Sequence, residues 1–218
     1  SSQFCLVDRG ITFAIAHVRG GGEMGEHWHK EALFERKKNS FLDYIAVANH
    51  LIEQKYTYKS GICFLGGSAG GLTGTAVANM APELFFSMLL LVPFCDPLTT
   101  MLNEKLPLTP SEWELWGNPI KSKKYFESIL SYSPYNNLRR TSYPPMLVTT
   151  SLFDSRVLYS EPIKYVAKLR ELKSDKNLQL LKCKMKAASH GGPSGRDNSI
   201  KELAEEFSFI LKTAGIKN

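Results

Sequence analysis

The chain has 218 residues, and its 43% hydrophobic and 22% charged content fits one globular domain with a sizeable core. The net charge of +6 is spread along the chain instead of forming basic runs interleaved with aromatic residues, which disfavours a nucleic-acid-binding protein. No hydrophobic run approaches the length of a membrane span, so we expect neither nucleic acid nor a membrane as a partner. The four cysteines have no paired spacing and no signal peptide is visible, which favours reduced thiols and a cytoplasmic location.

Segments typical of strands and of helices alternate along the chain. Residues 11–18, ITFAIAHV, are rich in β-branched and aromatic residues, so we expect them to form a buried strand. A helix is expected from Ser40, whose hydroxyl could cap it together with Asp43 three residues later. The same reading predicts further strands at 62–65, 88–94, 145–151 and 178–183, and further helices at 72–80, from Ser160, and around 200–211.

Residues 97–143 interrupt this alternation with short, proline-punctuated helices around Trp113 and Tyr125. We interpret this segment as an insertion, because such excursions often carry substrate contacts. The rest of the pattern predicts a single α/β domain over residues 1–218, in which helices flank a mostly parallel sheet.

Residues 66–70 read Gly-Gly-Ser-Ala-Gly between an expected strand and an expected helix. The pattern Gly-x-Ser-x-Gly is typical of a nucleophile elbow, a strained strand-to-helix turn that exposes its serine. We expect Gly66 and Gly70 to be required because larger side chains would collide at the turn. Ser68 is therefore the candidate nucleophile, and the backbone amide of Ala69 is the candidate oxyanion donor.

The partners of Ser68 are expected in the chain order serine, acid, histidine. His190 is the only histidine after Ser68, so it is the base by elimination. Asp154 follows the strand predicted at 145–151 and precedes a helix, which is the expected place for the acid; Asp96 also ends a strand and remains the alternative. In the resulting acyl transfer, His190 removes the proton of Ser68 while Asp154 orients the imidazole.

Two other motifs in the sequence are typical of different functions. Residues 20–25 satisfy Gly-x-Gly-x-x-Gly, with Asp43 at a suitable distance, but the next clear helix begins only near Ser40, which disfavours dinucleotide binding. His27 and His29 could chelate a metal as alternate residues of a strand, yet no third ligand lies nearby. We therefore expect no metal and no cofactor.

Longer stretches of the chain resemble the catalytic domain of the prolyl oligopeptidase family, and most of all its oligopeptidase B branch. These stretches run nearly end to end and include HVRGGGE at 17–23, GGSAGG at 66–71, NMAPELF at 79–85, WGNP at 116–119, SYSPY at 131–135 and VAKLREL at 166–172. The resemblance implies an α/β-hydrolase fold and maps the family's triad onto Ser68, Asp154 and His190. It also implies a cytosolic serine-type oligopeptidase that hydrolyses short peptides after Arg or Lys.

In the oligopeptidase B branch, a pair of carboxylates receives the basic side chain, and the matching residues here are Glu112 and Glu114. Two carboxylates suit a guanidinium because they offer charge-assisted, bidentate acceptors, and Trp113 or Trp116 could stack on it. The alternative is that the two acids merely form the acidic first turn of a short helix.

The resemblance further implies that an N-terminal β-propeller and the first strands of the hydrolase sheet are missing from this chain. One missing strand would lie between residues 11–18 and the elbow strand, and a missing tyrosine would donate the second oxyanion hydrogen bond. We expect short basic peptides as substrates and the missing segments as partners. Two alternatives stay open: an esterase or acyl hydrolase of the same fold, and a catalytically impaired fragment.

Overall fold

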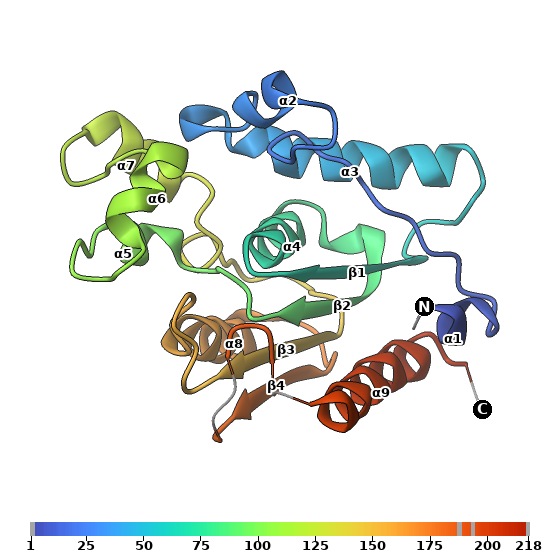
Figure 1. Cartoon of the computed structure of the whole chain (residues 1–218). Helices are drawn as coiled ribbons and strands as arrows, with labels where there is room; N and C mark the ends of the chain where they lie inside the picture. Colours follow the sequence, from blue (N-terminus) through green and yellow to red (C-terminus); the bar gives the residue numbers. More distant parts are fainter. Residues whose placement is uncertain (1–2, 187–188, 193–194, 217–218) are drawn as a thin grey trace.

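The computed structural model describes residues 3–186, 189–192 and 195–216. Within this part of the chain, four parallel strands form one sheet in the order β1-β2-β3-β4 (Figure 1). The strands are β1 (Ile62–Gly67), β2 (Phe85–Leu91), β3 (Met146–Ser151) and β4 (Gln179–Lys184). The strands predicted from residue 62 onward are thus confirmed, with β2 beginning and ending three residues earlier than expected.

Helices connect the strands and cover the sheet. The longer ones are α3 (Lys38–Glu53), α4 (Ala69–Met80), α8 (Ser160–Leu172) and α9 (Arg196–Thr213). The shorter ones are α1 (Phe4–Val7), α2 (Glu26–Lys30), α5 (Pro97–Met101), α6 (Thr109–Trp116) and α7 (Lys123–Leu130), with 3₁₀ turns η1 (Phe34–Arg36) and η2 (Pro82–Leu84). Helical crossovers such as α4 and α8 are what parallel neighbours require, so the predicted α/β class is confirmed.

The two central strands, β2 and β3, are buried on both faces of the sheet. On β2, Met88 and Leu90 enter a hydrophobic cluster shared with α3, α4 and α8, whereas Leu89 enters a second cluster shared with α1 and α9. Figure 1 shows α9 on the opposite side of the sheet from α3 and α4. A strand covered on both faces needs a nearly continuous hydrophobic run, and β2 has one in FFSMLLL. The result is a three-layer arrangement of helices, sheet and helices.

The segment 97–143 between β2 and β3 contains the short helices that the sequence predicts. Helices α5, α6 and α7 lie together at the left of Figure 1, beyond the carboxyl end of β2. Asp96 caps α5 by accepting a hydrogen bond from Thr99 N, and Trp113 Nε1 donates to Met101 O at 3.0 Å, which ties α6 to α5. The segment is therefore held against the edge of the sheet where the strands end.

The strand predicted at residues 11–18 is wrong. The structure assigns no strand there, and the side chains of Phe13 and Ile15 are 41% and 71% exposed. In the described sheet β1 pairs only with β2, and residues 11–18 do not join its other, free edge. Hydrophobic, β-branched residues form a strand only where a neighbouring strand can pair with their backbone groups.

The helix cap predicted at Ser40 is also wrong. Ser40 lies inside α3, and its hydroxyl donates to Arg19 O at 2.5 Å, while Asp43 accepts two hydrogen bonds from the Arg19 guanidinium and one from Arg19 N. Helix α8 does begin at Ser160, where a helix was expected, and Pro162 lies in its first turn. Long-range contacts with residue 19 thus replace the local capping that the spacing of Ser40 and Asp43 suggested.

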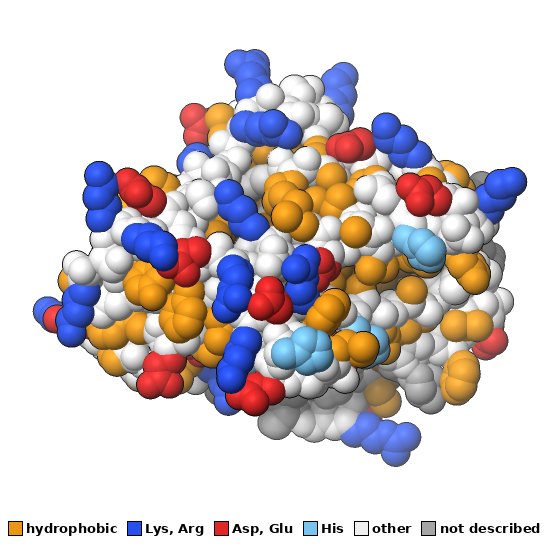
Figure 2. Space-filling view, turned by 90° about the horizontal axis from the view of Figure 1, so that it is seen from above, with side chains coloured by type: hydrophobic (Ala, Val, Ile, Leu, Met, Phe, Trp, Pro, Cys, Tyr) orange, Lys and Arg blue, Asp and Glu red, His pale blue; other side chains and the backbone are white. Residues whose placement is uncertain are grey.

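The charged side chains are distributed over the surface. Figure 2 shows the face that carries α2 and α3, where Lys and Arg side chains are scattered among acidic ones. Hydrophobic side chains lie between them and line a hollow on this face. In the part of the chain that the structure describes, no helix is both long and hydrophobic enough to cross a bilayer.

Candidate active site

Ser68 lies between the end of β1 and the start of α4 in a strained conformation. Its φ of 54° and ψ of −119° fall in a region that residues with a side chain rarely adopt. The neighbouring strand fixes this turn, because Ser68 N donates to Leu91 O at 2.9 Å and Phe94 N donates to Ser68 O at 3.1 Å. The strand-to-helix turn expected from Gly-x-Ser-x-Gly is present.

Close packing explains some of the glycines of the turn. A Cβ on Gly66 would lie 2.9 Å from Gly70 O, and one on Gly71 would lie 2.5 Å from Pro93 Cα. A Cβ on Gly70 would meet nothing within 4 Å. The expectation that Gly70 prevents a collision is therefore wrong, and Gly71 makes the closer approach.

A second strained residue lies beside the turn. Val92, directly after β2, has a φ of 42°, which is unusual for a β-branched residue. Its backbone N donates to Thr149 O at 3.0 Å, so β3 holds the bend in place. The bend brings Pro93 against Gly71 and Phe94 N against Ser68 O. Strain concentrated at one point of a fold is typical of functional sites.

His190 and Asp154 are brought together from two different loops. His190 Nδ1 lies 2.8 Å from Asp154 Oδ2, and the Asp154 side chain is fully buried. The other carboxylate oxygen, Oδ1, accepts hydrogen bonds from the backbone N of Arg156 at 2.8 Å and of Val157 at 3.0 Å. With both oxygens engaged, the carboxylate is fixed in one orientation and leaves Nε2 of the imidazole for proton transfer.

In the described residues, Ser68 makes no hydrogen bond to His190. Catalytic hydrogen bonds are often long or poorly aligned until a substrate binds, so this does not argue against the pair. The backbone N–H of Ala69, the first residue of α4, donates to no acceptor in the same part of the chain. A free N–H at a helix start beside Ser68 is suited to receive an oxyanion.

The alternative acid, Asp96, binds other residues than His190. Its fully buried carboxylate forms an ion pair with Lys164 of α8 and caps α5 through Thr99 N. The structure therefore pairs His190 with Asp154 and not with Asp96.

Glu161, which the sequence analysis did not single out, connects the elements around Asp96. It is 2% exposed and accepts hydrogen bonds from Asp96 N at 2.9 Å and from Thr100 Oγ1 at 2.5 Å. Burial raises the pKa of Glu161 to about 7. An acidic residue in the first turn of a helix is usually an exposed partner of the helix dipole, so no local signal indicated its burial.

Glu112 and Glu114 lie on α6 but do not lie side by side. Residues two apart on a helix point in different directions. Glu112 is half-buried and accepts a hydrogen bond from Trp116 Nε1 at 2.5 Å, whereas Glu114 is exposed. Trp116 itself is 5% exposed and packs edge-on against Phe94, and Trp113 is bonded to α5. Both indoles thus have structural contacts, and only Glu112 is tied to one of them.

The two other motifs do not form ligand sites. His27 and His29 lie on α2 and not on a strand, and His29 Nδ1 is 2.8 Å from Gly20 O. Residues 20–25 follow no strand, so the geometry of a dinucleotide-binding unit is not present. Among the residues that the structure describes, no group of three or more His, Cys, Asp or Glu side chains could hold a metal ion.

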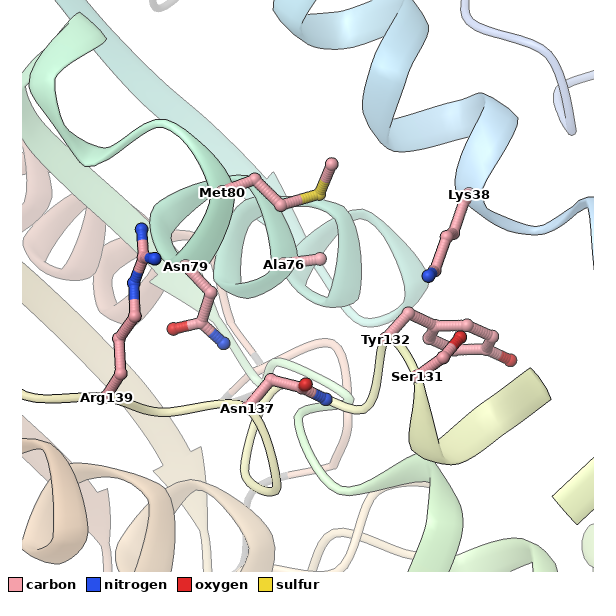
Figure 3. Close-up of a pocket in the computed structure, with 8 residues that line it drawn as sticks. All are labelled: Lys38, Ala76, Asn79, Met80, Ser131, Tyr132, Asn137 and Arg139. Atoms are coloured by element: carbon pink, nitrogen blue, oxygen red, sulfur yellow. The ribbon is translucent and has the colours of Figure 1, made fainter. Parts of the chain in front are cut away.

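A pocket of about 250 Å³ lies at the far end of α4 from Ser68. Figure 3 shows Asn79 of α4 pointing toward Asn137 of the segment before β3; Ala76, Met80 and Lys38 of α3 are among the other residues that line the pocket. The helix separates this pocket from the elbow, so it is not part of the candidate active site.

Comparison with known proteins places the chain in a family. The model of the prolyl oligopeptidase family matches residues 1–217. The chain belongs to the prolyl oligopeptidase family. Members of this family are serine peptidases, so the elbow at Ser68 lies in a hydrolase domain.

Curated members of the prolyl oligopeptidase family match almost all of the chain. Protease 2 from Moraxella lacunata is 49% identical over 212 residues, which are 97% of this chain and 30% of that protein. Dipeptidyl aminopeptidase BI from Pseudoxanthomonas mexicana is 47% identical over 211 residues, which are 97% of this chain and 29% of that protein. The chain thus spans about a third of the length of these relatives.

Solved structures of the family show the same fold. Oligopeptidase B from Leishmania major superposes with a TM-score of 0.94 at 45% identity, covering 97% of this chain and 29% of that one. Oligopeptidase B from Trypanosoma brucei, in a closed form with covalently bound antipain, superposes with a TM-score of 0.95 at 44% identity, covering 99% and 30%. The fold is therefore that of an α/β-hydrolase catalytic domain of the prolyl oligopeptidase family.

Proposed function

We propose that the chain carries the catalytic centre of a serine-type oligopeptidase, with Ser68 as nucleophile, His190 as general base and Asp154 as the residue that orients the base. The observation that carries this proposal is the 2.8 Å contact between His190 Nδ1 and Asp154 Oδ2, in a fold that also holds Ser68 in a strained elbow. Membership of a serine peptidase family supports the same assignment.

The reaction follows from these positions. His190 Nε2 takes the proton of Ser68 Oγ as the oxygen attacks the carbonyl carbon of the scissile peptide bond. The oxyanion accepts a hydrogen bond from Ala69 N–H, and the leaving amine departs with the proton from His190. Water then repeats the sequence on the acyl-enzyme, which releases the new carboxyl group and restores Ser68.

The preferred bond is one that follows Arg or Lys in a short peptide, with Glu112 and Glu114 supplying the negative charge. Support comes from relatives named protease 2 and oligopeptidase B, and from the half-buried position of Glu112. Phe94 links the two parts of the site, because its ring packs on Trp116 and its backbone N donates to Ser68 O. The chain's four free cysteines agree with a cytoplasmic setting for such an enzyme.

Labelling with an organophosphonate tests the nucleophile, because only an activated serine is phosphonylated. We expect one label per chain, on Ser68, and none in Ser68→Ala or His190→Ala. A panel of blocked Arg, blocked Pro and simple ester substrates then tests the reaction. Turnover of the ester without turnover of the Arg peptide would favour the esterase alternative, and absence of any label would indicate a catalytically impaired chain.

The substrate panel should also test for dipeptidyl aminopeptidase activity, because one relative carries that name. Dipeptidyl aminopeptidase BI is 47% identical to the chain. An enzyme of that kind needs a free amino terminus two residues before the scissile bond, whereas an endopeptidase does not. Arg substrates with free and with blocked amino termini therefore distinguish the two, and we expect the blocked substrate to be hydrolysed.

Separate Gln variants test the two carboxylates. Glu112→Gln should raise KM for an Arg substrate far more than for a neutral ester, by an amount equivalent to roughly 2–5 kcal/mol for a partly buried charge pair. Glu114→Gln, on the exposed side of α6, should have a smaller effect because solvent screens its charge. Equal effects on Arg and neutral substrates would show that the residues have only structural roles.

A further inference from the structure

Lys37 places a positive charge against the proposed binding site for a basic side chain. It lies between η1 and α3, and its Nζ is 4.5 Å from the centroid of the Trp116 ring. The edge of the same ring donates from Nε1 to Glu112 Oε2 at 2.5 Å. A cation on the face of the indole and a carboxylate at its edge form one connected group.

The acidic residues within six positions of Lys37 in the sequence already have cationic partners. Glu35 pairs with Lys124 at 2.5 Å, Glu31 pairs with Arg36 at 2.9 Å, and Asp43 pairs with Arg19 at 2.6 Å. Lys37 forms no ion pair in the described residues, and Glu112 is the acid whose charge acts on its ammonium.

Phe94 connects this group to the nucleophile elbow. Trp116 packs on Phe94 with ring centroids 5.4 Å apart, and Phe94 N is bonded to Ser68 O. Trp113 or Trp116 was a candidate to stack on the guanidinium of a substrate, yet Lys37 covers a face of the Trp116 ring. A basic side chain of a substrate that approaches Glu112 therefore meets a positive charge that is already there.

We propose that Lys37 is a specificity-determining residue that competes with the basic side chain of the substrate for Glu112 and Trp116. The proposal rests on the proposed function, in which Glu112 binds Arg or Lys. Its consequence is that basic substrates bind more tightly when Lys37 loses its charge, while neutral substrates are unaffected.

Burial lowers the pKa of Lys37 to about 8, and the charge of Glu112 opposes this shift. Below pH 8 the ammonium is charged and repels a substrate guanidinium, and above pH 8 the neutral amine does not. The guanidinium of a blocked Arg substrate stays protonated throughout this range. KM for that substrate should therefore fall as the pH rises from 7 to 9.

The test compares Lys37→Met, Lys37→Arg and Lys38→Met in the protein that contains these residues. Lys38 is an exposed neighbour that lines the pocket at the far end of α4, so it is a matched control. At pH 7 we expect Lys37→Met to lower KM for a blocked Arg peptide about five- to twentyfold, with no change for a neutral ester and none in Lys38→Met. Lys37→Arg, charged at every pH used, should lose the fall in KM between pH 7 and 9.

Binding of agmatine, measured by calorimetry, gives a readout that does not require turnover. Tighter agmatine binding in Lys37→Met than in the wild type supports the proposal even if no peptide is cleaved, in which case only the proposed function fails. The proposal is overturned if Lys37→Met binds agmatine no more tightly than the wild type does. It is also overturned if KM of Lys37→Arg still falls between pH 7 and pH 9. Lys37→Arg keeps the charge and the long stem, so it tests the proposal even if Lys37→Met does not fold.

Discussion

At the scale of single residues, the candidate site depends on which carboxylate meets the imidazole. Asp154 has both oxygens engaged, one by His190 and one by backbone amides, whereas Asp96 is bound to Lys164 and to the start of α5. Both aspartates follow a strand, so position alone left them as alternatives. The hydrogen-bond partners distinguish them.

Exchange of each aspartate for asparagine tests this distinction. Asp154→Asn should lower kcat by a factor of order ten thousand, because the amide no longer fixes the imidazole tautomer that accepts the Ser68 proton. Asp96→Asn should lower the free energy of unfolding, because it weakens a buried ion pair, with a much smaller effect on kcat. Steady-state kinetics and thermal unfolding of both variants provide the measurement, and a larger loss of kcat in Asp96→Asn would reverse the assignment.

Chemistry and chain order were sufficient to choose candidate site residues from the sequence. Ser68, His190 and Asp154 could be selected because few alternatives existed after the elbow. The relation of Glu112 to Glu114 could not be foreseen without the helix that separates them, and the burial of Glu161 depends on contacts with Asp96 and Thr100 from a distant segment. Side-chain environments of this kind are set by packing between elements.

At the scale of elements, α4 illustrates how tightly a helix can approach a parallel sheet. A Cβ on Gly74 would lie 2.4 Å from Phe64 Cε1 and 2.6 Å from Leu90 Cδ2. We expect Gly74→Ala to lower the free energy of unfolding by about 1–3 kcal/mol, because the added methyl overpacks this contact. Gly70→Ala, where a Cβ meets nothing within 4 Å, is the matched control and should not destabilise the fold. Chemical denaturation of the two variants decides the matter, and equal stabilities would argue against close packing.

The network around Glu161 should make the stability of the protein depend on pH. Because burial raises the pKa of Glu161 from 4.5 to about 7, the folded state favours the protonated acid. Its contribution is fully present below pH 4.5 and is lost as the pH rises through 7. The difference in Tm, Glu161→Gln minus wild type, should therefore increase from pH 5 to pH 8, because the wild type loses this contribution and glutamine does not titrate.

Differential scanning fluorimetry at several pH values measures this difference. Glu171→Gln, at an exposed position on the same helix, provides the control for the loss of one acidic charge. A Tm difference between Glu161→Gln and the wild type that is constant with pH would contradict the proposed titration.

Element-level prediction was reliable where an element is buried on both sides. The runs at β2 and β3 were found because strands covered on two faces read as continuous hydrophobic stretches, whereas β1 and β4 are only partly buried and contain shorter hydrophobic runs. Residues 11–18 have the same composition but form no strand, because in the described residues no partner strand lies beside them. Composition indicates whether a segment can form a strand. Whether it does form one depends on a neighbouring strand with which it can pair.

At the scale of the whole molecule, β1 is an edge of the described sheet, and residues 11–18 expose hydrophobic side chains near the start of the chain. We expect the 218-residue chain, expressed alone, to give oligomeric or insoluble material with weak or no peptidase activity, because unpaired strand edges and exposed hydrophobic residues promote association. Size-exclusion chromatography and turnover of a blocked Arg peptide measure both properties. A soluble monomer with high turnover would contradict this expectation.

Residues 11–18 are held at both ends, and in the described part of the chain no backbone amide from residue 12 to residue 17 donates a hydrogen bond. Ile11 N donates to Leu6 O in the turn after α1, and Arg19 is clamped by Asp43 of α3. Amide hydrogens between these anchors should exchange with solvent almost as fast as in a free peptide, while those of β2 and β3 exchange only when the whole domain opens. The two ends of the segment are therefore fixed, while the backbone between them is free to form new hydrogen bonds. It can do so without any rearrangement of the sheet.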